Sequence, residues 1–416
     1  MVEILPFKGL VYNQSKVDDL SRVISPPYDV ITPDLDKKLR KLSPYNIINL
    51  IVPSGSGTVD KYRQANLIMQ EWIKENILKF DPNSCFYLIE ESFMLDGVPK
   101  SITGFIGLTK IEDYKTQKVL RHENTLPKPK QDRLKLLENT RTNFGLVYTV
   151  YRDSSHLIRD ISNSFAPDIS INPEYDNSLG FKMWRICQPD IIENITGLMA
   201  PKSILIADGH HRYETSRIYY RQSIQKGLPA WGQQYILTLF VNSNQKDITV
   251  YPTYRLVKMV KATDSGHLAR RAKPFFNVSF ASLKELDIKK FMSTHRKEKN
   301  PAFIIYLGKD KVMTATYKKK LQKNDLWQDL DVNILHNIFL KEVIEPGNIE
   351  NISFTHSLDQ LKHEIDRNVY HMGILLNAPT VDEVETLSRQ GFLMPQKSTY
   401  FYPKPCTGLV MYKFKN

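Results

Sequence analysis

The chain has 416 residues, 41% of them hydrophobic, so we expect either two domains or one domain with a large extension. Its net charge of +12 favours polyanionic partners or an anionic small substrate, although the basic clusters are dispersed. The first residues lack a basic segment followed by an apolar one, and no apolar run reaches the roughly 18 residues of a membrane span. These features argue against export and membrane insertion.

The three cysteines, Cys85, Cys187 and Cys406, lie far apart in sequence and form no CxxC pair. This spacing argues against a disulfide framework and against a structural zinc site. We therefore expect a protein of the reducing cytoplasm.

The hydrophobic pattern predicts helices and strands in mixed order. From Asp60, apolar residues recur at three- and four-residue spacing, which predicts an amphipathic helix. Short β-branched and aromatic runs predict strands at 85–95, 102–111, 144–152, 233–241 and 248–257. After a polar stretch at 261–273 the pattern restarts, with strands at 302–310, 312–317, 369–377 and 408–415 and helices at 331–344, 357–368 and 381–390.

This order lacks the regular β-α-β alternation of a doubly wound parallel sheet. The sequence therefore predicts an α+β fold of mixed sheets with packed helices. We expect one domain over residues 1–260 and a C-terminal α+β lobe over residues 261–416.

Three segments carry residues suited to substrate or phosphate binding. "SPPYDVI" places Asp29 in a rigid turn, where aspartate is also favoured for capping alone. "RHENTLPKPKQDRL" has His122, Glu123 and Asn124 before a Pro-Lys-Pro-Lys stretch. We expect this stretch to hold Lys128 and Lys130 in an extended loop, either covering phosphates or serving as an exposed linker.

A helix is then expected to open at Arg133. Glu123 is a candidate general base.

The third segment, "MPQKSTYFYPKPCTGLV", gathers basic and aromatic side chains: Lys397, Ser398, Tyr400, Tyr402 and Lys404. Cations beside aromatic rings suit a nucleotide or a nucleic-acid strand. An edge strand with alternating side chains explains the same pattern equally well.

The stretch "KSILIADGHHRYETSRIYYRQ", Lys202 to Gln222, predicts a strand that passes into a helix through a turn of ionisable groups. A helix N-terminus near His211 stabilises an anion, and Gly209 lets a ligand approach the backbone. His210, His211 and Arg212 add hydrogen-bond donors.

Asp208 is a candidate base, Mg²⁺ ligand or N-cap, and the sequence does not choose among these roles. A metal-dependent phosphohydrolase is a weaker alternative for this turn, because the adjacent histidines point about 100° apart on a helix.

These four motifs, in their order along the chain, resemble the bacterial and archaeal domain of unknown function 1015. The turn itself resembles the nucleotide-binding turn of the ParB/sulfiredoxin-like superfamily. Gly209, His211 and Arg212 match sulfiredoxin's glycine, histidine and arginine, but His210 stands at its cysteine, so sulfiredoxin chemistry is not implied. The run Asp208 to Arg212 follows the Asp-Gly-His-x-Arg form of free-serine kinases.

The resemblance implies a ParB/sulfiredoxin-like core in the N-terminal part and a kinase that phosphorylates the hydroxyl of a small metabolite, with free L-serine one candidate. ATP or ADP would donate the phosphoryl group, with Mg²⁺. Phosphates would contact Gly209, His210, His211, Arg212, Lys128, Lys130 and Arg133. The catalytic candidates are Asp208, Glu123 and His211, and the substrate candidates are His122, Asn124, Asp29, Lys397 and Ser398.

A non-enzymatic, DNA-associated nucleotide-binding protein of ParB type is the alternative from another class. The sequence shows no recognisable helix-turn-helix after the turn, so nucleic acid is not the favoured partner.

Overall fold

The computed structural model describes residues 2–54, 60–95, 97–125, 127–228, 232–318, 327 and 330–414. The chain divides into two compact units. The first unit contains Met1–Arg121, Thr125–Ile248 and Pro403–Asn416, and the second contains His122–Asn124 and Thr249–Tyr402. The second unit is therefore almost entirely an insertion between Ile248 and Pro403, and the chain leaves the first unit at Ile248 rather than at residue 260.

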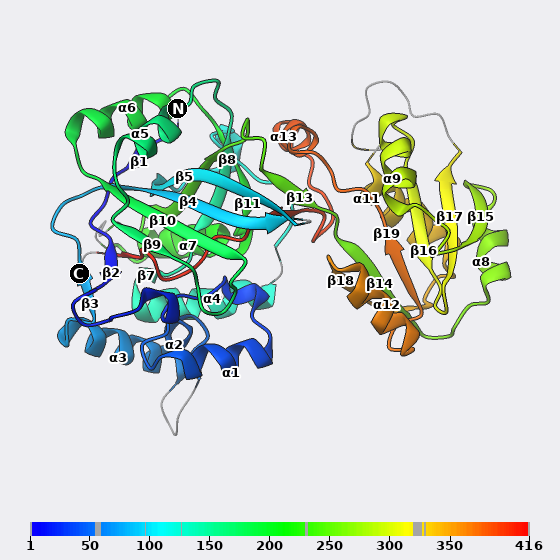
Figure 1. The fold of residues 1–416 in the computed structure, drawn as a ribbon, viewed down its shortest axis with the longest axis horizontal. Helices are drawn as coiled ribbons and strands as arrows, with labels where there is room; N and C mark the ends of the chain where they lie inside the picture. The colour runs from blue at the N-terminus through cyan, green and yellow to red at the C-terminus, as the bar shows by residue number, and fades with distance from the viewer. Residues whose placement is uncertain are drawn as a thin grey trace. The chain divides into compact units, whose positions relative to one another are not determined.

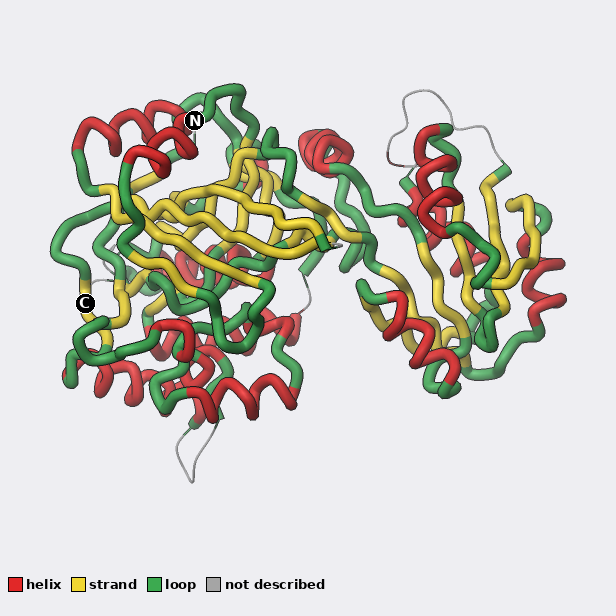
Figure 2. The backbone as a smooth tube through the Cα atoms, in the orientation of Figure 1, coloured by secondary structure: helices red, strands yellow, loops and turns green. Residues whose placement is uncertain are grey.

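Both units combine helices with sheets, which confirms the predicted α+β class (Figures 1 and 2). The main sheet of the first unit has the strand order β6-β11-β8-β12-β5-β4-β10-β9, and β1 pairs with β5 off this path. Among the described strand pairs of this sheet, only β11–β6 and β12–β8 are parallel. Its strands are β1 (Ile4–Leu5), β4 (Phe86–Leu95), β5 (Val98–Lys110), β6 (Val119–Leu120), β8 (Val147–Tyr151), β9 (Ile169–Ile171), β10 (Leu179–Ile186), β11 (Ile204–Asp208) and β12 (Tyr235–Asn242).

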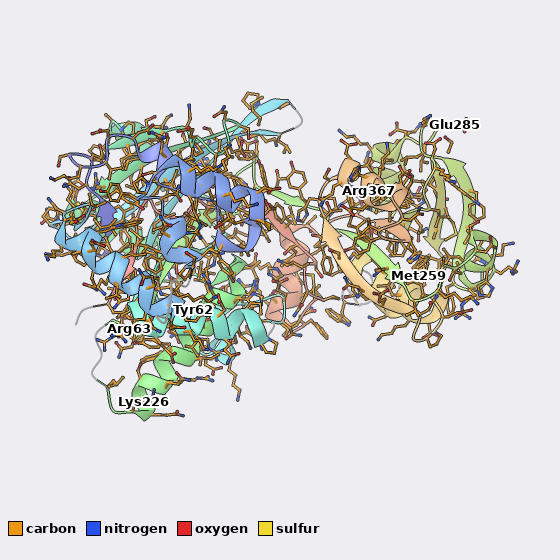
Figure 3. The ribbon with its side chains drawn as sticks, turned by 90° about the horizontal axis from the view of Figure 1, so that it is seen from below. Tyr62, Arg63, Lys226, Met259, Glu285 and Arg367 are labelled. Carbon is orange, nitrogen blue, oxygen red and sulfur yellow. A yellow bond between two sulfur atoms is a disulfide. The ribbon has the colours of Figure 1, made fainter. Side chains whose placement is uncertain are left out.

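Helices cover both sides of this sheet. The helices of the first unit are α1 (Pro33–Leu42), α2 (Ile48–Ile51), α3 (Lys61–Lys74), α4 (Pro127–Thr140), α5 (Leu157–Ser164), α6 (Pro189–Met199) and α7 (His210–Gln225), with 3₁₀ turns η1 (Leu20–Arg22), η2 (Tyr28–Val30) and η3 (Tyr114–Thr116). Figure 1 shows α5 and α6 together on one side and α1–α4 on the other. Helix α4 packs against both α3 and α7. Tyr62 of α3, labelled in Figure 3, donates to the Asp132 carboxylate of α4 at 2.7 Å, so these two helices are tied by a side-chain bond.

Two small sheets attach the ends of the chain to the first unit. Strand β2 (Leu10–Tyr12) pairs with β3 (Leu78–Phe80), and β21 (Tyr412–Lys413) pairs with β7 (Thr142–Asn143). The strand expected at 408–415 is thus reduced to β21, and it belongs to the first unit rather than to a C-terminal lobe.

The second unit is built on an antiparallel sheet of order β15-β17-β16-β19-β14-β18. Its strands are β14 (Tyr254–Met259), β15 (Phe276–Ser282), β16 (Ala302–Tyr306), β17 (Lys311–Tyr317), β18 (Ile349–Thr355) and β19 (Met372–Leu375), with a separate pair of β13 (Thr249–Tyr251) and β20 (Tyr400–Tyr402). Its described helices are α8 (Ser265–Ala272), α9 (Ile288–Lys297), α11 (Asp331–Ile334), the π-helical η4 (Leu335–Val343), α12 (Leu358–Asp366) and α13 (Val381–Arg389). The strand expected at 248–257 is split into β13 and β14, because Pro252 lacks the N–H that a ladder requires.

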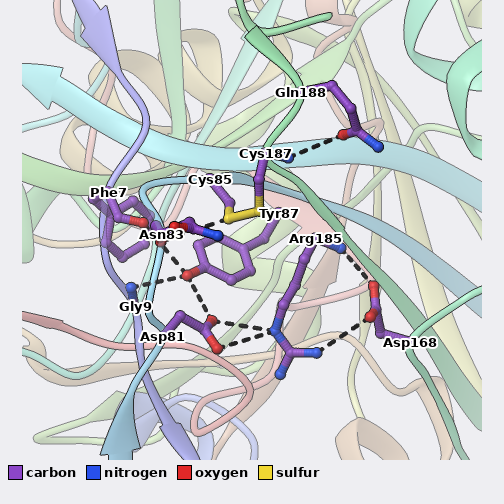
Figure 4. The surroundings of a disulfide bond; sticks show 10 residues. All are labelled: Phe7, Gly9, Asp81, Asn83, Cys85, Tyr87, Asp168, Arg185, Cys187 and Gln188. Carbon is purple, nitrogen blue, oxygen red and sulfur yellow. Dashed lines mark hydrogen bonds and ion pairs between the residues drawn. A yellow bond between two sulfur atoms is a disulfide. The ribbon is translucent and has the colours of Figure 1, made fainter.

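A disulfide joins Cys85 to Cys187, so the expectation that the cysteines stay unpaired is wrong (Figure 4). Cys85 directly precedes β4 and Cys187 directly follows β10, and these strands pair antiparallel with Phe86 opposite Ile186. Spacing along the chain hides this neighbourhood, because 102 residues separate the two cysteines. Cys406 is free and buried. The expectation of a cytoplasmic location rested on unpaired cysteines and loses that support.

Within the described ranges, no helix combines the length and the apolar character needed to cross a bilayer.

Candidate functional site

The turn between β11 and α7 is shaped by Gly209. Strand β11 ends at Asp208, Gly209 has φ 93° and ψ 23°, and α7 begins at His210. This left-handed backbone favours glycine, and a Cβ on Gly209 would lie 3.1 Å from Arg212 Nε and 3.2 Å from Val147 Cα. No side chain caps α7, so Asp208 is not its N-cap. The partial positive charge of this helix end favours an anion.

Asp208 instead forms a small ion cluster with two cations. Arg212 Nη2 donates to Asp208 Oδ2 at 2.5 Å, and Lys404 Nζ donates to Asp208 Oδ1. The side chains of Asp208 and Arg212 are each 12% exposed, and that of Lys404 is 11% exposed. Together the three side chains carry one net positive charge.

A cavity of about 60 Å³ lies beside this cluster, within the first unit. Arg133 and Arg212 both line it, with Tyr28, Gly145, Thr215 and Thr407 among the other lining residues. It has room for several water-sized groups. Arg212 Nε is buried and has no hydrogen-bond partner among the described residues. The cavity is thus lined by two cations, Arg133 and Arg212. The Nε–H group of Arg212 has no acceptor among the described residues.

Gly145 makes room for the Arg212 guanidinium. A Cβ on Gly145 would lie 3.1 Å from Arg212 Nη1. Because a Cβ on Gly209 would approach Nε equally closely, two glycines far apart in sequence define where the Arg212 guanidinium can lie.

Three residues hold the Arg133 side chain in place. Its Nη1 donates to the Ile51 carbonyl at 2.7 Å, and its Nε donates to Asp132 at 2.9 Å. Its guanidinium lies 4.2 Å from the Tyr28 ring centre. Burial raises the pKa of Tyr28, against the opposing effect of Arg212, so its hydroxyl stays protonated at neutral pH and can donate a hydrogen bond.

The Pro-Lys-Pro-Lys stretch is helical, which corrects the expected extended loop. Helix α4 begins at Pro127, and Arg133 lies inside it rather than at its start. Proline is compatible with the first turn of a helix, where the missing N–H would have no intrahelical partner. Lys130 is half-buried, and its carbonyl accepts from the Thr215 hydroxyl at 3.5 Å. The Lys128 side chain lies outside the described residues.

Five of the expected substrate and catalytic residues belong to the second unit. Glu123 Oε2 accepts from the Lys397 backbone N–H at 3.1 Å, and the Ser398 hydroxyl donates to the Pro395 carbonyl. His122 is buried, with Nε2 2.8 Å from the Thr399 hydroxyl, and Asn124 is exposed. These residues therefore form one neighbourhood, in a different unit from the turn.

The remaining expected residues lie in the first unit. His210 is 3% exposed, His211 is half-buried, and Asp29 is exposed. Tyr28, the neighbour of Asp29, lines the cavity instead. Sequence reasoning missed Tyr28, Gly145 and Thr407, and it did not connect Lys404 with Asp208. Tyr28 and Lys404 stand inside quoted motifs, whereas Gly145 has only a strand signal around it.

Among the described residues, no group of three or more His, Cys, Asp or Glu side chains is arranged to hold a metal ion.

Comparison with solved structures gives distant likenesses. A free serine kinase in complex with AMP is 13% identical, covers 74% of this chain and 90% of its own, and has a TM-score of 0.39. A conserved hypothetical protein from Pyrococcus furiosus is 14% identical, covers 74% of this chain and 94% of its own, with a TM-score of 0.34. C-terminally truncated SbnI from Staphylococcus aureus is 9% identical, covers 73% and 86%, and has a TM-score of 0.37.

No curated protein matches the chain. The profile described as "Protein of unknown function (DUF1015)" matches residues 4–333, which span most of the sequence. The chain belongs to the DUF1015 family.

Proposed function

We propose that the cavity beside Gly209 binds the phosphates of a nucleotide and that the protein transfers a phosphoryl group to the hydroxyl of a small metabolite. The observation that carries this proposal is the pair of arginines, Arg133 and Arg212, lining one cavity while Arg212 Nε has no partner among the described residues. Free L-serine is the first acceptor to test, because the turn has the Asp-Gly-His-x-Arg form of free-serine kinases.

The arrangement suits phosphoryl transfer, in which positioning and charge stabilisation supply most of the catalysis. Arg133 and Arg212 would neutralise phosphate charge, and the protonated Tyr28 hydroxyl would add a donor. Gly209, His210 and His211 would bring the first N–H groups of α7 to the phosphates, with Lys130 of α4 as a further cation.

Asp208 supports this site as a positioning residue. Its two oxygens accept from Arg212 and Lys404, so it holds both cations at the turn. The same pairing makes Asp208 a poor fit as a Mg²⁺ ligand, because a metal ion would have to displace one of these cations. We therefore derive no step through a magnesium ion held by Asp208.

His211 and Glu123 are the candidates for orienting the attacking hydroxyl. His211 is the second residue of α7, after His210, and lies in the first turn of that helix. In the second unit, Glu123, His122, Asn124, Lys397 and Ser398 stay the predicted acceptor-binding set, and in the first unit Asp29 stays a predicted substrate residue.

The proposal is tested by titrating the purified protein with AMP, ADP and ATP, with and without Mg²⁺, in a calorimeter. Arg212→Ala should weaken nucleotide binding by about tenfold or more, since a charge-assisted hydrogen bond contributes roughly 1.5–3 kcal/mol. Arg221→Ala is the matched control on the same helix, because Arg221 is 61% exposed and pairs with Asp113.

Nucleotide-dependent phosphorylation of an acceptor, assayed over a panel of hydroxyl-bearing metabolites beginning with L-serine, then separates an enzyme from a non-enzymatic nucleotide-binding protein of ParB type. No affinity for any of the three nucleotides in the wild-type protein would remove the proposal.

A further inference from the structure

Arg255 is buried in the second unit and has no counter-charge among the described residues. It lies on β14 between Phe354 of β18 and Ile374 of β19, and its exposed fraction is 0%. Arg255 Nη1 donates to the Thr253 carbonyl. Burial lowers the pKa of Arg255 to about 9, so the group is still charged at neutral pH. An ionised guanidinium buried without a partner is strongly unfavourable.

The unused donors of Arg255 lie on one edge of its guanidinium. Nε and Nη2 have no hydrogen-bond partner in the described part of the chain. These two N–H groups form the edge that binds an oxyanion with two parallel hydrogen bonds. Because Nη1 is anchored to Thr253, the guanidinium is already oriented for such a ligand.

Thr253 and His336 supply further buried polar atoms in the second unit. Thr253 is 1% exposed, and its hydroxyl has no partner among the described residues. The same holds for His336 Nε2 in the π-helical segment η4. His336 belongs to η4, and burial first and the charge of Arg255 second lower the pKa of this histidine to about 4. His336 is therefore neutral at pH 7.

The sheet face on which Arg255 lies is covered by η4. Arg255 and Ile374 are opposite each other, as are Ile374 and Ile305, so these side chains share a face. Phe303, two residues from Ile305, is on that face and packs against Phe339 of η4, with ring centres 6.1 Å apart. The opposite face carries Leu256 and a separate apolar cluster.

The charge balance selects the class of ligand. Arg255 supplies one positive charge, whereas His336 and Thr253 are neutral. A singly charged anion leaves the buried site neutral, whereas a doubly charged phosphate leaves an excess negative charge. A carboxylate has one charge and the planar geometry that matches the guanidinium edge.

We propose that the second unit contains a binding site for the carboxylate group of a small molecule, formed by the free edge of Arg255 with the Thr253 hydroxyl and His336. This site is independent of the phosphate cavity in the first unit and does not rest on the nucleotide proposal.

The test measures thermal unfolding of the full chain at constant ionic strength in chloride, acetate, propionate, inorganic phosphate and sulfate. Acetate or propionate should raise the unfolding temperature of the second unit saturably, while chloride should not. Failure of every carboxylate to raise it would overturn the proposal. A larger shift with phosphate or sulfate would also overturn it, since the ligand class would then be a different anion.

Arg255→Met is the decisive variant, because methionine fills similar space without the charge. It should lose the carboxylate-dependent shift, and in chloride its second unit should unfold at a higher temperature than that of the wild type. Arg367→Met is the matched control, since Arg367 is exposed on the same unit (Figure 3), and it should keep the full shift. Retention of the shift in Arg255→Met contradicts the proposal.

Thr253→Val provides a second variant that leaves the charge in place. It should weaken acetate or propionate affinity about threefold to tenfold, measured by NMR titration of ¹³C-labelled ligand. Unchanged affinity in both Thr253→Val and Arg255→Met would assign the binding to another place on the protein.

Discussion

Arg212 is constrained from several directions at once. Asp208 accepts a hydrogen bond from Arg212 Nη2. Because Gly145 and Gly209 have no Cβ, they leave space for Arg212 Nη1 and Nε, respectively. The sequence predicted Gly209 and Arg212 as site residues, because a glycine and an arginine between a strand and a helix have a recognisable chemistry. Gly145 could not be predicted in the same way, because only the folded structure shows which atoms a side chain at position 145 would contact.

Replacement of Gly145 by alanine should reduce nucleotide binding more than stability. The added Cβ would lie 3.1 Å from Arg212 Nη1, so the guanidinium must move by a few tenths of an ångström. We expect nucleotide affinity to fall about threefold to tenfold, part of the roughly 1.5–3 kcal/mol of a charge-assisted bond. Calorimetric titration and urea unfolding of the same samples measure the two effects.

Gly197→Ala is the matched control for Gly145→Ala. A Cβ on Gly197, inside α6, would meet no atom within 4 Å. This substitution should raise the free energy of unfolding by about 0.5–1 kcal/mol and leave nucleotide affinity unchanged. If Gly145→Ala binds nucleotide as the wild type does, the geometry of the Arg212 guanidinium is not important for binding.

Glu91 makes stability depend on pH. It is 2% exposed on β4, and burial raises its pKa to about 8, from 4.5 for the free side chain. Between these values the folded protein holds a proton that the unfolded chain releases. The free energy of unfolding should therefore fall as pH rises from about 4.5 to 8, by at most about 1.4 kcal/mol per pH unit, and then level off.

Glu91→Gln should remove this dependence, because glutamine does not titrate. Urea unfolding at pH 5, 6, 7 and 8 compares the slopes of the variant and the wild type. Glu90→Gln is the control, since Glu90 is the next residue on the same strand and pairs with Lys182 at 2.9 Å. Parallel pH curves for wild type and Glu91→Gln would show that Glu91 does not titrate in this range.

At the scale of elements, the passage from β11 to α7 follows from local sequence. An apolar run, a glycine and a helical pattern place a strand, a turn and a helix in that order, and the structure has all three. The start of helix α4 could not be placed in the same way, although a helix was predicted from Arg133. Its first turn contains Pro127 and Pro129, which indicate a loop by composition, and its packing against α3 and α7 is visible only in the fold.

The disulfide links one end of strand β4 to the adjacent end of its partner strand β10. Cys85 and Cys187 close a loop across 102 residues at one end of this strand pair. Removing the link with Cys85→Ser/Cys187→Ser should lower the free energy of unfolding by about 2–4 kcal/mol, chiefly because the unfolded chain gains freedom. Urea unfolding without reductant measures the loss.

A reductant provides the control for the disulfide prediction. It should lower the stability of the wild type to that of the double variant and leave the double variant unchanged. Equal stability of the wild type with and without reductant would show that this link does not stabilise the fold.

At the scale of the whole molecule, the sequence predicted the α+β class and many of the strands but not the path of the chain between units. Composition changes near Lys261, yet the chain leaves the first unit at Ile248 and returns at Pro403. The return depends on contacts of Ser25 with Thr407 and of Leu10 with Met411. Such pairings join segments hundreds of residues apart, and no local sequence pattern predicts them.

Because the chain returns to the first unit at Pro403, the first unit is completed only after the second unit has been synthesised. Lys404 and the β21 strand leave the ribosome after the whole of the second unit, whereas Asp208 and Arg212 are made much earlier. During synthesis the turn therefore exists for some time as an arginine-aspartate pair without its lysine. The complete ion cluster of Asp208, Arg212 and Lys404 can therefore form only after the chain has been translated as far as Lys404.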